Sequence, residues 1–306
     1  MTGLEAFLLT VITASTPFLL AAIGELVVER SGVLNLGVEG MMVMGAVCGF
    51  GAAHLTGSPW LGVLAAILAG AAMALLFGFL TQILITNQVA TGLSITLLGL
   101  GLSGLIGSNL VGLPGEKMQP LNVFGLNEMP ILGTLVFGQD PLVYISILLT
   151  LGVAYFLYRT RAGLIVRAVG QSHQSAHALG YKVIAVRLSC IVFGGCCAGL
   201  AGAYLSLSYT PQWIENMTAG RGWIALALVV FSTWMPGRLA IGAYLFGTVW
   251  ILGLYAQAWG IGIPSQFLSS LPYLATIVAL ILISTNRRLS VVNTPASLGQ
   301  GFVPDR

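Results

Sequence analysis

The polar residues that could do chemistry are few, and four of them lie in one apolar stretch near the N-terminus. Glu25, Glu29, Asn35 and Glu39 stand among long runs of aliphatic residues. Such side chains are costly next to lipid, so they must face protein or water. The glycines between residues 32 and 40 predict a break in the helix here. The freed N–H groups would then line a solute pathway with Asn35 and Glu39, or the acids merely satisfy a buried turn.

A second group of polar residues begins at Asn87. Asn87, Thr91 and Ser94 are spaced i, i+4 and i+7, which places them on one helical face. This stripe either lines a pathway or joins helices. Trp223, beside Arg221 at a predicted helix start, either stacks on a ring-bearing solute or anchors the chain at the membrane interface.

Enzymatic chemistry has no support in the sequence. His173 and His177 have a spacing that can bind metal, but a third ligand is missing and a solvated helix face is favoured. The GxGxxG pattern at residues 99–104 lies inside an apolar run, whereas a dinucleotide site needs a strand, a turn and a helix. It reads instead as a small-residue packing face, as do the GxxxG pairs at 45–49 and 195–199. We therefore predict a protein that is not an enzyme, with no catalytic residue, metal or cofactor.

Composition indicates how these residues are positioned. Only 7% of the 306 residues are charged and 57% are hydrophobic, whereas a soluble domain has about 25% charged residues. The sequence predicts an all-α polytopic membrane bundle in residues 1–286, with a short polar tail, disordered, at 287–306. About nine transmembrane helices are expected, at 6–28, 41–50, 60–85, 89–110, 141–158, 188–209, 222–234, 239–259 and 271–284. The span at 222–234 is short and resembles half of a broken helix, and residues 131–137 suggest a re-entrant or surface segment.

The orientation follows from the loop at 159–187, which holds five of the twelve basic residues and no acid. Because Lys and Arg resist translocation, this loop is cytoplasmic, which places the N-terminus outside and the C-terminus inside. The net charge of +3 follows this topology and gives no indication of nucleic acid. Within the loop, Ser172 is a predicted N-cap and Gly180 a predicted left-handed stop for a short helix.

Several stretches resemble the permeases of ATP-binding cassette (ABC) importers of the branched-chain amino acid, ribose and nucleoside type. The resemblance is carried by RAVG at 167–170, residues 176–180 and Arg187, and by four longer stretches, ERSGVLNLGVEGMMVMGA at 29–46, 87–109, 198–204 and 210–231. Permeases of nucleoside importers that work with a basic membrane lipoprotein are the most similar branch. The resemblance covers nearly the whole chain up to residue 284.

The resemblance implies a permease subunit that takes up nucleosides or related sugar-bearing molecules across the bacterial inner membrane. A separate ABC ATPase subunit would act on the short helix, at Ser172, His173, Ala176, Leu179 and Gly180. A second homologous permease, a periplasmic or lipoprotein solute-binding protein docked on 112–140 and 212–221, and membrane lipid are the other expected partners. The alternative is a secondary transporter or channel for small polar solutes that works without an ATPase, with its buried acids as proton carriers.

Overall fold

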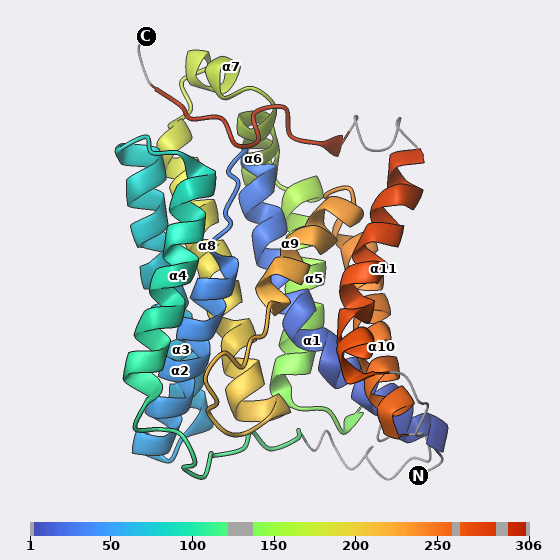
Figure 1. Ribbon diagram of the computed structural model, residues 1–306. Coiled ribbons are helices and arrows are strands. Elements are labelled where there is room, and N and C mark those ends of the chain that lie inside the picture. The colour runs from blue at the N-terminus through green and yellow to red at the C-terminus, as the bar shows by residue number, and fades with distance from the viewer. Residues whose placement is uncertain (1–2, 122–136, 259–263, 286–292, 304–306) are drawn as a thin grey trace.

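The computed structural model describes residues 3–121, 137–258, 264–285 and 293–303 (Figure 1). Every regular element in these ranges is helical, which confirms the predicted all-α class. In chain order the elements are α1 (Gly3–Arg30), α2 (Val38–Thr56), α3 (Pro59–Gly78), the π-helical turn η1 (Phe79–Ile83), α4 (Gln88–Gly107), α5 (Pro141–Arg159), α6 (Arg161–Gln171), α7 (His173–Ala178), α8 (Val183–Tyr204), the π-helical turn η4 (Leu205–Tyr209), α9 (Arg221–Phe231), α10 (Pro236–Ala258) and α11 (Ser265–Thr285).

Seven of the described helices are long and apolar enough to cross a membrane: α1, α2, α3 with η1, α4, α5, α8 with η4, and α10. Helix α9 has only eleven residues, whereas a full crossing needs about 20. Figure 1 shows that α9 covers only part of the height of the bundle and that the irregular segment 210–220 leads into it. The prediction that the span at 222–234 is too short for a full crossing is confirmed, and we call α9 the half helix. The predicted segment at 131–137 lies, apart from residue 137, outside the described residues.

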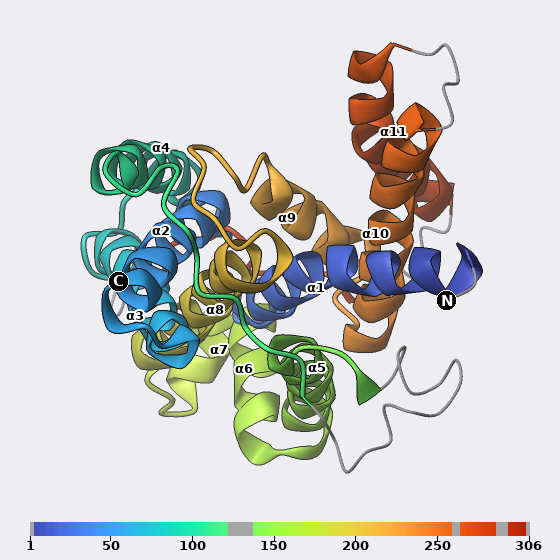
Figure 2. The same ribbon diagram turned by 90° about the horizontal axis from the view of Figure 1, so that it is seen from below.

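Helix α8 lies at the centre of the bundle, packed along α1, α2 and α3 (Figure 2). Glycines permit this close approach. A Cβ atom at Gly45 would overlap the backbone of Gly199, and one at Gly195 would overlap the backbone of Gly70. Both predicted GxxxG pairs therefore do bring helices together. Of the pattern at 99–104, Gly99 packs against Gly40 of α2, which confirms the packing prediction there, whereas no described residue of this chain lies within 4 Å of a Cβ atom at Gly101.

The two ends of the bundle differ in what they carry. Helix α1 begins at one end, while α6, α7 and residues 293–303 lie across the other (Figure 1). The prediction of a disordered tail is wrong for residues 293–303, which pack onto the bundle; we call them the C-terminal strap. The backbone N–H of Ser297 donates to the carbonyl of Gly170 at 2.9 Å, and that of Gly299 donates to Gly32 at 3.2 Å.

Candidate functional site

The chain breaks between α1 and α2 as the glycines predicted. Gly32 adopts a positive φ of +88°, and a Cβ atom there would meet Arg187 and the backbone of Gly170, so only glycine fits this turn. Gly37 is the residue from which α2 starts. Gly40, in contrast, does not break the helix: it lies inside α2, where a Cβ atom would overlap the backbone of Ile95.

Asn35 and Glu25 satisfy the polar groups of this break. The backbone N–H and the side-chain amide of Asn35 donate to the two oxygens of Glu25, each at 3.3 Å. The N–H of Gly37 donates in turn to Oδ1 of Asn35 at 2.9 Å. All of these groups are buried, and a buried polar group without such a partner would be costly. In this conformation Asn35 is engaged with protein.

Glu39 holds the start of the half helix α9. Its carboxylate accepts from the hydroxyl of Thr218 at 2.5 Å, from N–H of Gly220 at 2.9 Å and from N–H of Gly222 at 2.6 Å. The first N–H groups of a helix have no partner within it, and the helix dipole favours a negative charge there. A Cβ atom at Gly222 would collide with Glu39, so glycine is what permits the contact.

Glu29 and Arg30 hold the other end of α9. The turn after the helix contains Trp234 at a positive φ of 55°. The indole N–H of Trp234 donates to Glu29 at 2.6 Å, and Nε and Nη2 of Arg30 donate to the carbonyl of Trp234 at 3.1 and 2.7 Å. Residues of the segment 29–39 therefore form hydrogen bonds at both ends of α9. These contacts support the alternative in which the acids satisfy buried polar groups of the protein. The sequence did not reveal the partners.

Arg221 and Trp223, near the start of α9, differ in burial. Arg221 is buried, with its guanidinium 4.6 Å from the ring centre of Trp250 and 5.8 Å from that of Tyr209, a cation–π arrangement that the sequence analysis missed. Trp223 is half-buried against the core. Its predicted contact with a solute stays a prediction.

The predicted stripe on α4 divides into buried and exposed positions. Asn87 is exposed and caps the helix by accepting from N–H of Ala90 at 3.0 Å. Thr91 is buried and shares a hydrogen bond of 2.8 Å with Thr86. Ser94 is exposed and donates to the carbonyl of Ala90. Asn87 and Ser94 thus face outward from this subunit, and the pathway role of the three stays a prediction.

Helix α7 has the two predicted end signals. Ser172 accepts from N–H of Ser175 at 3.2 Å, which confirms the N-cap. Gly180 has a φ of +86°, and N–H of Tyr181 donates to the carbonyl of Ala176 at 3.1 Å, which confirms the left-handed stop. His173 and Ala176 are buried, whereas Leu179 is 76% exposed at the tip. This helix therefore presents Leu179 outward on a fixed base.

The C-terminal strap forms part of that base. The ring of Phe302 lies 5.4 Å from that of His173 and 5.3 Å from that of His177, both edge-on. Nη1 of Arg187 donates to the carbonyl of Gln300 at 2.9 Å. Sequence reasoning missed the strap, and the signal available was slight: Phe302 is one large aromatic residue in a short polar tail.

Arg187 joins α7 to the break after α1. Its Nη2 lies 3.4 Å from Nδ1 of His173, and its Nε donates to the carbonyl of Ser31 at 3.3 Å. Burial, and then the charge of Arg187, lower the pKa of His173 below its usual value. A neutral imidazole can accept a hydrogen bond from the guanidinium. One chain of contacts thus leads from α7 through Arg187 to the segment that holds α9.

Discontinuous helices inside an apolar helical bundle are typical of membrane transport proteins. The chain matches the family described as "Branched-chain amino acid transport system / permease component" over residues 7–284, and it belongs to that family. The putative glucose ABC transporter permease protein TsgC13 of Haloferax volcanii is 39% identical over 95% of both chains. The nucleoside ABC transporter permease protein NupC of Lactococcus lactis is 31% identical over 91% of this chain and 92% of its own length. The guanosine ABC transporter permease protein NupQ of Bacillus subtilis is 30% identical, with coverages of 87% and 88%.

Two of these organisms have a second permease protein that matches this chain. The glucose ABC transporter permease protein TsgB13 of Haloferax volcanii is 23% identical over 90% of the chain. The guanosine ABC transporter permease protein NupP of Bacillus subtilis is 26% identical over 74% of it.

Proposed function

We propose that this chain is the permease subunit of an ABC importer that brings a sugar-bearing small molecule, a nucleoside or a monosaccharide, into the cell. Membership of the permease family supports the assignment as an ABC importer permease over that of a secondary transporter or channel. The named substrates of the relatives, glucose, nucleosides and guanosine, share a hydroxylated sugar ring. The ATP would be hydrolysed by a separate ATPase subunit, and the membrane is the bacterial cytoplasmic membrane.

The proposed topology has nine crossings, one of which is completed by the half helix α9 and the segment before it. The N-terminus lies outside and the C-terminus inside. Support comes from the clustering of cations at one end of the bundle. Arg30 donates to Asn293 of the C-terminal strap at 3.1 Å, and the strap packs on the basic loop. Cationic loops remain on the cytoplasmic side, so the solute-binding protein would dock at the opposite end.

The ATPase would dock on α7, with Leu179 inserted into its surface and Gly180 giving the turn that presents it. His173 and Ala176 face the bundle and hold the helix in place, and Ser172 caps it. Movement of α7 would then reach α9 through Arg187, Ser31 and the segment 29–39. Such a chain of contacts biases a two-state bundle only if both of its ends change together.

The solute pathway would run along the outward face of α4, where Ser94 lies, and past the half-buried Trp223 of α9, with Asn87 near its inner end. A second homologous permease would complete it, as the paired relatives suggest. Thr91, Asn35 and Glu39 would shape the pathway from behind, because their polar groups are bonded to protein.

Reconstitution tests the proposal. The chain is co-expressed with its ATPase and second permease, placed in vesicles with the solute-binding protein, and supplied with labelled guanosine or glucose. We expect uptake that requires ATP and stops when the ATPase is inactivated. Concentrative uptake by the purified chain alone, driven by an ion gradient, would instead identify a secondary transporter.

A further inference from the structure

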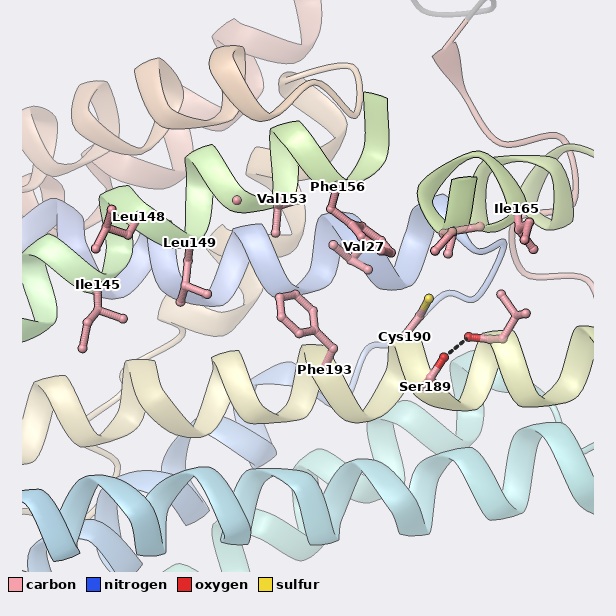
Figure 3. Close-up of a pocket in the computed structure, with 14 residues that line it drawn as sticks. Val27, Ile145, Leu148, Leu149, Val153, Phe156, Ile165, Ser189, Cys190 and Phe193 are labelled. Carbon is pink, nitrogen blue, oxygen red and sulfur yellow. Dashed lines mark hydrogen bonds between the residues drawn. The ribbon is translucent and has the colours of Figure 1, made fainter. Parts of the chain in front are cut away.

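An apolar groove with a volume of about 680 Å³ opens between α5 and α8 (Figure 3). Helix α5 lines it from Ile145 to Phe156, α8 contributes Cys190 and Phe193, and Val27 of α1 lies at its base. Residues of α6 line the end nearest the turn between α5 and α6. Helix α5, which lines the groove, lies on the other side of α1 and α8 from α4 and α9, the helices that we assign to the solute pathway (Figure 2).

The chemistry of the lining excludes a sugar or a nucleoside. Among the described residues that line the groove, only Ser189 and Cys190 carry polar side-chain atoms. The hydroxyl of Ser189 already donates to the carbonyl of Val186 at 2.8 Å. A polar solute would lose its hydrogen bonds to water here without replacement. The lining therefore fits hydrocarbon.

The length of the groove fits one leaflet. From Ile145 to Phe156 the helix rises about 16 Å at 1.5 Å per residue, and one leaflet of the hydrocarbon core is about 15 Å deep, half of about 30 Å. A single acyl chain from one leaflet can therefore lie along α5 for the whole groove.

Three cations stand at the loop end of the groove. Arg159 is three residues beyond Phe156 and continues the lining face of α5. Lys182 precedes the first residue of α8 and lies four residues before Val186, which lines the groove. Arg161 precedes Ala162, which lines the groove. All three are exposed, and the loop from 159 to 187 contains no acid. A phosphate at this end would meet positive charge without a competing carboxylate from the loop.

We propose that the groove binds an anionic phospholipid of the inner leaflet, with one acyl chain between α5 and α8 and its phosphate at Arg159, Arg161 and Lys182. Basic residues at the membrane surface attract anionic lipids, and the apolar lining holds the chain. The site is separate from the solute pathway, so it stands whichever solute is carried.

Photo-crosslinking tests the acyl-chain site in the full chain purified in lipid nanodiscs. The probe is phosphatidylglycerol with a diazirine near the end of one acyl chain, and mass spectrometry locates the label. We expect labelling on the faces of α5 and α8 that line the groove. In Gly152→Phe labelling should fall about tenfold, because no described residue lies within 4 Å of a Cβ atom there and the ring would fill the groove. Leu151→Phe, at a position 63% exposed outside the lining, is the matched control, and Gly152→Leu should give an intermediate decrease.

Exchange of the headgroup tests the cationic end. We expect phosphatidylglycerol to label the wild-type chain roughly tenfold or more above the same probe with a phosphatidylcholine headgroup. The triple variant Arg159→Gln, Arg161→Gln, Lys182→Gln should lose this preference, and Arg238→Gln, at the start of α10, should keep it. Labelling that Gly152→Phe leaves unchanged would overturn the proposal. Equal labelling by both headgroups in the wild type, or cross-links through α5 between two permease chains, would overturn it too.

Discussion

Replacing Glu39 with Gln tests whether the half helix α9 depends on a buried carboxylate. Both oxygens of Glu39 accept hydrogen bonds, from Thr218 and Gly220 on one side and from Gly222 on the other. A glutamine of the same size offers one oxygen, so its NH₂ group must face a donor. Either way round, at least one donor at the start of α9 loses its partner in a site where Glu39 is 3% exposed.

The expected cost has two parts. A buried donor left without a partner costs about 1–3 kcal/mol, and loss of a negative charge at a helix N-terminus costs about 0.3–2 kcal/mol. Together these give roughly 1.3–5 kcal/mol in the free energy that opens the start of α9. Because each 1.4 kcal/mol is a factor of ten, amide hydrogen exchange at Gly220 and Gly222 should accelerate by about 10-fold to 4,000-fold.

The control removes the same charge nearby. Glu215 is exposed in the segment before α9, and Glu215→Gln should leave the exchange at Gly220 and Gly222 unchanged. Exchange in Glu39→Gln that matched the wild type within a factor of about three would refute the clamp. Uptake should fall with the faster exchange, since a half helix free at its start is no longer anchored to α2.

Three further changes test the inner end of the bundle. Phe302→Ala should reduce the uptake obtained per ATP hydrolysed several-fold, because α7 loses its contacts with the Phe302 ring. The control Val303→Ala, at the next residue, whose side chain is 41% exposed, should leave this ratio unchanged. Gly180→Val should uncouple ATP hydrolysis from uptake without affecting membrane insertion, since φ is +86° there. Wild-type uptake by this variant would remove α7 from the mechanism. The matched control is Gly57→Val, at φ +68° in another loop where the described residues leave open space. The pKa of His173 is lower in the folded protein than its ordinary value of about 6.5. Neutral His173 therefore contributes its full stabilisation of the fold above about pH 6.5, and this stabilisation is lost as the pH falls through the pKa of the folded protein. The unfolding temperature should therefore drop more between about pH 7 and pH 5 in the wild type than in His173→Asn, and equal drops would contradict this.

Local signals in the sequence were sufficient where one short stretch determines the structure. Ser172 and Gly180 predicted both ends of α7 because caps and left-handed turns depend on neighbouring residues. The glycines at 32 and 37 predicted the break after α1 for the same reason. The short apolar run at 222–234 predicted a half helix because length alone limits what can cross a membrane.

Contacts between distant residues could not be predicted in the same way. Nothing near Glu39 in the sequence indicates that its partners are Thr218 and Gly222, almost two hundred positions away. The C-terminal strap was missed because a polar segment with one aromatic residue has no period that distinguishes a packed tail from a free one. Such a segment is held by backbone groups, like that of Ser297 on Gly170, and its composition does not record them.

The arrangement of the clamps implies how α9 can move. Glu29 and Arg30 are the last residues of α1, a continuous helix of 28 residues, and they hold the end of α9. Glu39 is in the first turn of α2 and holds its start. A shift of α1 relative to α2 must therefore tilt α9 or break one of these sets of hydrogen bonds. Arg187 ties α7 to Ser31, on the α1 side of the break, so a push on α7 reaches the end of α9 before it reaches the start. We infer that α9 pivots about Glu39, and that Trp223, one residue beyond Gly222, moves little while the end at Trp234 swings.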